Sequence, residues 1–241
     1  MGNIFGEGFH PNINKQVKIR QKKYGSGYTK SRTPEDILYL NGNTSWCKLA
    51  SATDLGSSDN RLAKQYVLFN GTTPSHEFGP DSLSVEQRGG VGGELGAYGL
   101  GGTTHSGLAP MPGITSVSIV HENRGSLRRA ELKIKAFNKE QFNIIDILYL
   151  RLGFSVLIEW GHTMYFQNDG TFIKNNSYTL TDDFLNGKYK YTDFLNIIKD
   201  YRLKSEGNYD AMFGKVSNFS WSFDKNGTYS IILKLVSMGD V

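Results

Sequence analysis

The sequence predicts a β-rich α+β fold, and three observations carry that prediction. Aromatic residues, which favour β-strands, make up 12% of the 241 residues. Residues 127–137 alternate between apolar and polar side chains, as a strand with one wet face does. Asn226-Gly227 lies between two alternating segments and is a strong hairpin signal. The regular part of the fold is therefore expected to be built from strands with helices packed on them.

The first 32 residues are polar and basic without sustained periodicity, which predicts an arm without regular structure. The dense basic run Lys15–Lys30 is compatible with a solvated arm, an arm that docks on an acidic neighbour, or nucleic-acid contact. The net charge of +4 is only a mild excess, so we expect no specific nucleic-acid partner.

The next segment predicts one short helix and two short strands. Thr33 is a good N-cap and Pro34 suits the first helical position, while Asn41-Gly42 stops the helix. Residues 45–50 and 65–69 are candidate strands.

Residues 89–107 hold nine glycines. Their spacing matches neither GxxxxGK[ST] nor GxGxxG, no strong strand leads into them and no capped helix follows. This pattern favours a flexible loop over a phosphate site. Because the loop and residues 1–32 bury little apolar area, we expect neighbouring subunits to order both. Residues 1–110 thus form a predicted N-terminal region of arm, short helix and Gly-rich loop.

Residues 111–241 predict a β domain that begins with a hairpin. Residues 115–120 and 127–137 flank the turn 121–126, whose Gly125 can supply a positive φ. In the second strand the expected buried set is Ala130, Leu132, Ile134 and Ala136, and the expected exposed set is Arg129, Glu131, Lys133 and Lys135.

A helix is predicted over 138–152. Asn138 is the expected N-cap, Gln141 completes a capping-box pattern, and Gly153 is a natural stop. The apolar stripe consists of Phe142, Ile145, Leu148 and Leu152, broadened by Ile144 and Tyr149. This stripe is expected to pack across the sheet formed by the flanking strands.

The strand predicted at 154–160 is followed by a polar and helical insertion at about 163–210. Asn168-Asp169-Gly170 predicts a hairpin turn, and Thr192 caps a helix that runs to Lys204. The residues expected to be buried on that helix are Phe194, Leu195, Ile198, Tyr201 and Leu203.

The chain closes with a predicted hairpin of strands 217–223 and 228–236, joined at residues 224–227. The expected inward residues of its second strand are Tyr229, Ile231, Leu233 and Leu235. Four aromatic residues are predicted to be core: Trp160, Phe219, Trp221 and Phe223.

We predict no catalytic, cofactor-binding or metal-binding residue in this chain. The histidines, none of which are in HxxxH spacing, are His10, His76, His105, His121 and His162. The single cysteine, Cys47, has no local nucleophile motif and predicts a small buried residue. Asp182-Asp183 could hold a cation, but a helix start explains the pair as well.

Glu159 beside Trp160 is superficially like a glycosidase carboxylate beside a sugar-stacking ring. A second carboxylate cannot be placed from the sequence, and the alternative is a residue on the polar face of a strand. A carbohydrate-binding or carbohydrate-cleaving β-protein therefore stays open as the alternative function.

Two segments of the chain resemble virion structural proteins of contractile-tailed bacteriophages, in the baseplate hub and tail-tube-related family. The first is Pro112-Gly113-Ile114 through ENRGSLRRAELKIKAFNKEQFNIIDILYLRLGFSVLIEWG, and the second is Asn208–Gly214 with the hairpin Val216–Asp240. Arg32-Thr33-Pro34-Glu35 and Ser45–Ala50 look similar too.

The resemblance implies a tube-type, barrel-like antiparallel fold with a packed helix, whose copies join into a trimer or ring around a channel. It implies a hub or tube-adaptor subunit that joins the tail tube to the central spike, with other baseplate proteins as partners and no enzymatic activity. Because no apolar segment approaches ~20 residues, no membrane partner is expected. The expected location is the virion tail baseplate, after synthesis in the host cytoplasm.

Overall fold

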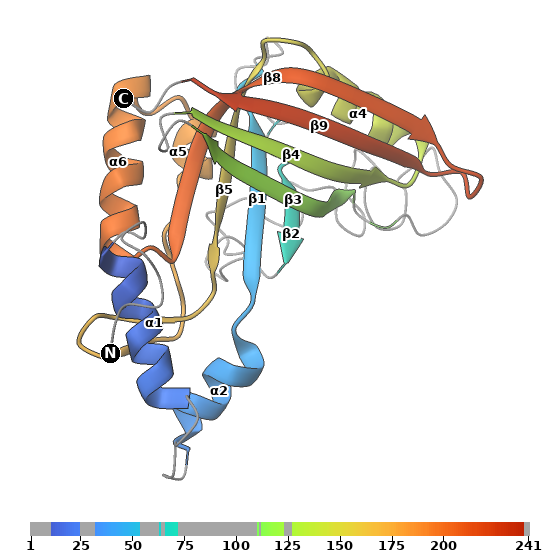
Figure 1. Cartoon of the computed structure of the whole chain (residues 1–241). Coiled ribbons are helices and arrows are strands. Elements are labelled where there is room, and N and C mark those ends of the chain that lie inside the picture. Colours follow the sequence, from blue (N-terminus) through green and yellow to red (C-terminus); the bar gives the residue numbers. More distant parts are fainter. Residues whose placement is uncertain are drawn as a thin grey trace.

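A single seven-stranded antiparallel sheet, in the order β2-β1-β5-β8-β9-β4-β3, organises the computed structural model (Figure 1). The structure describes residues 11–24, 32–53, 63, 66–71, 110, 112–122 and 127–238, and the side chains of the first helix over 14–23. The sheet strands are β1 (Ser45–Ser51), β2 (Leu68–Gly71), β3 (Gly113–Glu122), β4 (Leu127–Ala136), β5 (Ser155–His162), β8 (Tyr209–Phe223) and β9 (Tyr229–Ser237). The helices are α1 (Pro11–Tyr24), α2 (Pro34–Gly42), α4 (Lys139–Tyr149), α5 (Thr181–Leu185) and α6 (Tyr191–Lys204), and β6 (Tyr165–Phe166) pairs with β7 (Phe172–Ile173).

The sheet curls strongly, so its two outermost strands approach each other (Figure 1). The side chain of Asn70 in β2 bonds to the backbone of Ile114 in β3. The prediction of a β-rich α+β fold with a barrel-like sheet is confirmed at this level. Because β1 and β2 belong to the same sheet as the later strands, the sheet crosses the predicted boundary at residue 110.

The β3–β4 hairpin has the predicted alternation. Ala130, Leu132, Ile134 and Ala136 are buried, whereas Arg129 and Lys133 are exposed and Glu131 and Lys135 are half-buried. The four buried side chains join an apolar cluster on the inner face of the sheet, which also includes Val156 and Ile158 of β5 and Leu233 of β9.

Helix α4 covers this inner cluster, as predicted. Ile145 and Leu148 are fully buried in it, Phe142 packs against it, and the side chain of Asn138 accepts the predicted cap bond from Gln141 N. Gln141 Oε1 accepts from Phe137 N instead of Asn138 N, so the capping box is shifted by one residue. The predicted end at residue 152 is wrong: the helix ends at Tyr149, and Leu152 is 66% exposed.

The opposite face of β1, β5 and the first half of β8 is covered by α5 and α6. Phe194 and Ile198 of α6 pack there on Leu157, Tyr209 and Phe213. Lys190, not Thr192, occupies the N-cap position of α6, and Leu203 is 50% exposed rather than buried. Gly170 turns the β6–β7 hairpin with a φ of 92°, as expected.

The N-terminal segment differs from the predicted arm, because residues 11–24 form helix α1. Gln16 Nε2 donates to Phe166 O at 2.6 Å, and Arg20 Nη2 donates to Asn208 Oδ1 at 3.4 Å. Lys23 lies 3.7 Å from Asp36 in α2, whose predicted Thr33 cap is confirmed. Part of the basic run is therefore held by polar contacts within this chain.

Strand β8 is longer than predicted and contains a bulge between Val216 and Asn218. Residues 209–215 of β8 pair with β5 and residues 214–223 pair with β9, so that beyond the bulge β9 is the only strand partner of β8 within the described residues. The prediction that Trp221 and Phe223 are core residues is wrong, since they are 51% and 61% exposed. They lie beyond the reach of β5, at the tip of the hairpin.

Strand β2 begins at Leu68, three positions later than the candidate strand at 65–69. The Gly-rich segment 89–107 and three of the histidines, His10, His76 and His105, lie outside the described residues.

Candidate assembly surface

A polar sheet face extends over β3, β4, β9 and the second half of β8. Its exposed or half-buried members are Ser116, Ser118 and Val120; Arg129, Glu131 and Lys133; Ile232, Lys234 and Val236; and Asn218, Ser220 and Ser222. The register places Ser118, Glu131, Lys234 and Asn218 in one row across the four strands. Below, this surface is called the four-strand polar face.

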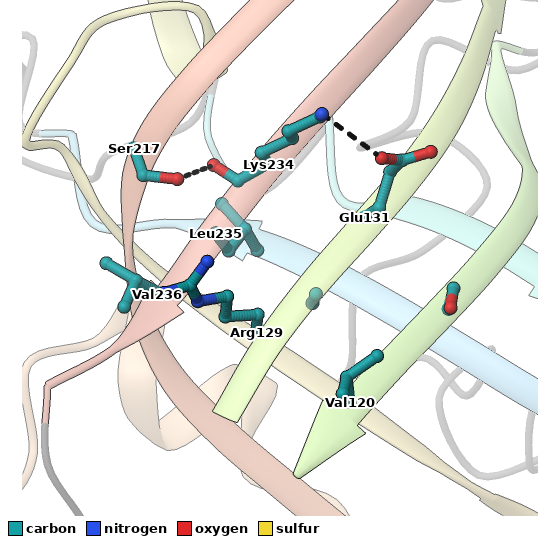
Figure 2. A pocket seen from close by; sticks show the side chains of 9 residues that line it. Val120, Arg129, Glu131, Ser217, Lys234, Leu235 and Val236 are labelled. Carbon is teal, nitrogen blue, oxygen red and sulfur yellow. Dashed lines mark hydrogen bonds and ion pairs between the residues drawn. The ribbon is translucent and has the colours of Figure 1, made fainter. Parts of the chain in front are cut away.

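A shallow groove of about 580 Å³ lies on the four-strand polar face (Figure 2). Lys234 Nζ lies 3.5 Å from Glu131 Oε2 across the β4–β9 pair, and Ser217 Oγ donates to Lys234 O at 3.0 Å. Arg129 and Val120 line the other end of the groove. A smaller hollow of about 300 Å³ beside Ser220 continues it. Charges of both signs lie in the middle of this face, which makes it a hydrated surface rather than a site for one anion or cation.

At the two edges of this face, residues 116–120 of β3 and 217–223 of β8 carry no charged side chain, and the charged Glu122 lies at the end of β3. Residues 116–120 read SVSIV and residues 217–223 read SNFSWSF, and among the described residues β4 and β9 are their only strand partners. The charged residues lie on the interior strands, at Arg129, Glu131, Lys133 and Lys234. Natural proteins usually place Lys, Pro or bulges along exposed edges to prevent pairing with another chain. The free stretches here lack Lys and Pro, and the bulge of β8 lies at the very start of its stretch, between Val216 and Asn218. The residues beyond the bulge can therefore pair with a further strand.

Glu159 lies on a different part of the sheet, and the prediction of a wet polar-face residue is wrong for it. The side chain is 0% exposed, because α5 and the segment before it cover this face of β5. Oε1 accepts from Leu180 N and from Tyr209 Oη, both at 2.6 Å, and Oε2 accepts from the hydroxyls of Thr179 and Thr181.

Lys48 compensates the buried charge of Glu159. The two residues are opposite each other in the β1–β5 pair, with 3.9 Å between Lys48 Nζ and Glu159 Oε2. The ammonium also donates to Thr179 at 2.6 Å and lies 4.9 Å from the centroid of the Trp46 ring. Sequence reasoning missed this network, although an acid inside FSVLIEW and a lysine inside SWCKLA were its signal.

The geometry around Glu159 does not resemble a glycosidase site. Both carboxylate oxygens are occupied by donors and neither reaches solvent, while Trp160 is half-buried and packs with the inner cluster on the other face. A general acid or nucleophile must contact its substrate. The arrangement holds the β1–β5 pair to the segment 179–181.

The other candidate residues lie apart from one another. Cys47 is buried, and burial raises the pKa of its thiol to about 12. Asp182 and Asp183 lie in the first turn of α5, the predicted helix start, and Asp183 pairs with Lys188 at 2.9 Å. His121 is exposed on β3, and burial lowers the pKa of half-buried His162. Within the described part of the chain, no three His, Cys, Asp or Glu side chains are grouped as metal ligands would be.

No helix in the described ranges combines the length and the apolar character needed to cross a membrane. Comparisons with protein-family models, with curated proteins and with solved structures give no match for this chain.

Proposed function

We propose that this chain is a structural subunit of a phage tail baseplate, a hub or tube-adaptor subunit that joins the tail tube to the central spike. The observation that supports this proposal is the four-strand polar face, which lies between two strand edges for which the described residues provide no further strand partner. A subunit of this kind works through shape, buried area and a polar lining, and needs no reaction chemistry. The proposed location in the tail baseplate rests on the sequence resemblance.

The strand directions favour repeated side-by-side joining. Strands β3, β4, β9 and β8 alternate in direction, so the two edge strands run antiparallel to each other. When β8 of one copy lies beside β3 of the next in the same orientation, the antiparallel pattern continues. Such a contact uses two different surfaces and can therefore close into a ring.

The same joining would place the four-strand polar face of every copy on one side of a continuous sheet. Hydrated side chains such as Ser118, Glu131 and Lys234 would then line a channel, and the inner cluster with α4 would lie outside it. Closure of a sheet into a barrel also requires strands to be tilted and staggered. An offset of the two free edges favours such a stagger, since the free part of β3 lies toward the Arg129 end and that of β8 toward the hairpin tip.

The carbohydrate alternative has less support from the geometry. Its candidate acid, Glu159, is fully buried, and its candidate stacking ring, Trp160, lies on the opposite face of β5. A glycan-binding function would instead need a site that includes neither residue.

Cross-linking with paired cysteines tests the side-by-side contact. Ser118 in β3 and Ser220 in β8 are exposed, and Cys47 is buried with a raised pKa, so it does not compete for a maleimide. A chain with both Ser118→Cys and Ser220→Cys, treated with a short bismaleimide, is expected to give a ladder that ends in a closed trimer or larger ring.

Each single-cysteine variant is the control, because a contact between different edges leaves it uncross-linked. A dimer from Ser220→Cys alone would mean a two-fold β8–β8 contact instead. A double variant that stays monomeric, together with a monomeric mass in sedimentation, would contradict the proposed assembly. Labelled copies seen by electron microscopy away from the tail baseplate would contradict the proposed location.

A further inference from the structure

The tip of the β8–β9 hairpin carries a half-exposed aromatic cluster of Phe142, Trp221, Phe223 and Tyr229, here called the hairpin aromatic cluster. Phe142 of α4 stacks on Tyr229, with 4.4 Å between ring centroids and 15° between planes. Trp221 lies 4.8 Å from Phe142, and Phe223 lies 5.0 Å from Tyr229. Trp221 and Phe223 nevertheless remain 51% and 61% exposed. Two large rings are thus held in place while about half of their surface stays open.

The exposure of these rings follows from where β5 ends. Strand β5 pairs with β8 only from Tyr209 to Lys215, and the backbone of Phe154 and Gly153 reaches no further than Val216. Beyond that point the described residues place no strand on the edge of β8 that faces away from β9. The open apolar surface and the unpaired strand edge are therefore adjacent, and one extended partner segment would cover both.

We propose that Trp221 and Phe223 anchor the contact between neighbouring copies of this chain, against Val117 and Ile119 of the next copy's β3. This inference rests on the proposed function and names the residues that hold its ring contact. Val117 and Ile119 are half-buried on the apolar face of β3, at the opposite edge of the same sheet.

The alternation of side chains restricts the pairing register. Two strands can pair with their apolar faces on one side only in every second register. In the registers that overlap most of residues 217–223 with residues 116–122, this rule places Trp221 opposite Val117 or Ile119. With Trp221 opposite Val117, the polar-face pairs at the junction are Ser222 with Ser116 and Ser220 with Ser118. With Trp221 opposite Ile119, they are Ser222 with Ser118 and Ser220 with Val120, and no like charges meet in either register.

The chemistry of the pair suits an interface anchor. Tryptophan is among the residues whose truncation most often costs more than tenfold in affinity. Cross-strand pairs of an aromatic with a β-branched residue are favourable in antiparallel sheets. A ring already oriented by Phe142 loses little further freedom on binding.

The test compares self-assembly of Trp221→Ala and Phe223→Ala with wild type by sedimentation across a concentration series. Each variant is expected to raise the concentration needed for assembly at least about 30-fold. Leu203→Ala is the matched control, because Leu203 is equally exposed on α6, away from the strand edges, and should leave assembly unchanged.

Thermal melting of the monomer separates a lost contact from a lost fold. Phe223→Ala is the cleaner variant, since Tyr229 is the one ring that Phe223 contacts among the described residues. Its melting temperature is expected to stay near the wild-type value. If the Phe223→Ala and Trp221→Ala variants fold and assemble as wild type does, the anchor is wrong although the ring proposal stands. If the chain that carries Ser118→Cys and Ser220→Cys gives no cross-link between copies, the proposed function itself fails.

Discussion

Asn70 in β2 donates a hydrogen bond of 2.7 Å from Nδ2 to the backbone oxygen of Ile114 in β3. These residues belong to the first and last strands of the sheet order, so the bond joins its two ends. Nearby, a Cβ on Gly113 would lie 3.1 Å from Phe69 O, which shows how closely the two backbones approach. The curled sheet is thus nearly closed where β2 approaches the start of β3, and the described residues place no strand beside the outer edge of β3 beyond that point.

Asn70→Ala should loosen this closure without unfolding the protein. Loss of one hydrogen bond costs about 0.5–1.5 kcal/mol of unfolding free energy. Hydrogen exchange is expected to quicken at the start of β3, around Ile114, and not in β9. Asn143→Ala, at an exposed position on α4, is the control and should change neither rate. If the hydrogen-exchange rates of Asn70→Ala equal those of the wild type throughout the sheet, the bond is dispensable for this closure.

Leu132→Ala should cost about 2–5 kcal/mol of unfolding free energy, because Leu132 is fully buried in the inner cluster. The neighbouring Lys133→Ala removes an exposed side chain and should change stability by less than about 0.5 kcal/mol. Denaturant unfolding of both variants measures the contrast. Equal losses would mean that the two faces of β4 do not differ as described.

Glu159→Gln should destabilise the protein by about 3–5 kcal/mol, because it leaves the buried Lys48 ammonium without its carboxylate. Replacing both members of the pair with Lys48→Met and Glu159→Gln should recover part of the loss. Glu131→Gln, on the wet face, is the control, and chemical unfolding of all the variants is the measurement. Wild-type stability in Glu159→Gln would argue that the pair is not the buried charge network described here.

Cys47 should resist alkylation while the protein is folded. Burial raises the pKa of its thiol from 9.0 to about 12, and the Glu159 carboxylate acts in the same direction, so almost no thiolate exists at pH 8. Mass spectrometry after maleimide treatment should find no label in buffer and one label in urea. The exposed cysteine of Ser220→Cys should react under both conditions. Rapid labelling of wild type in buffer would place Cys47 at the surface.

Asp224 should titrate with a pKa of about 2, below its usual 3.8, mainly because Lys135 donates to it at 2.5 Å and Ser230 donates as well. Since the folded pKa lies below the unfolded one, the contribution to stability is complete above pH 3.8 and is lost as the pH falls toward 2. Carboxyl NMR titration should show a higher pKa for Asp224 in Lys135→Ala. Asp169, held by Thr171, should be unaffected.

The elements predicted well from sequence are those whose signals are local. Alternation in β4 and the cap at Asn138 depend on neighbours within a few residues, and both are present in the structure. Alternation also groups Phe219, Trp221 and Phe223 on one face correctly. It cannot tell how far a cover extends along that face. Strand β5 ends before the tip, and Phe142 of α4 contacts Trp221 but leaves about half of that ring exposed.

The features that sequence reasoning missed depend on distant contacts. Helix α1 is held by a hydrogen bond from Gln16 to the backbone oxygen of Phe166, and a local sequence pattern cannot indicate a partner so far away in the chain. Glu159 is buried because residues 179–181 and α6 cover its strand, which a polar residue in an alternating pattern does not indicate. The groove on the four-strand polar face likewise requires four strands whose order is fixed only by folding.

Because of the bulge at Ser217, the odd-numbered side chains of one continuous strand, β8, contribute to apolar clusters on both faces of the sheet. Before it, odd-numbered residues such as Phe213 face α6; after it, odd-numbered Phe219 and Trp221 face the inner cluster instead. Side chains alternate between the two faces of a strand, so the one extra residue reverses the face on which the odd-numbered side chains lie. A chain lacking that one position would turn its aromatic rings onto the wet side and its serines into the core. At this point the number of residues carries more structural information than their identity.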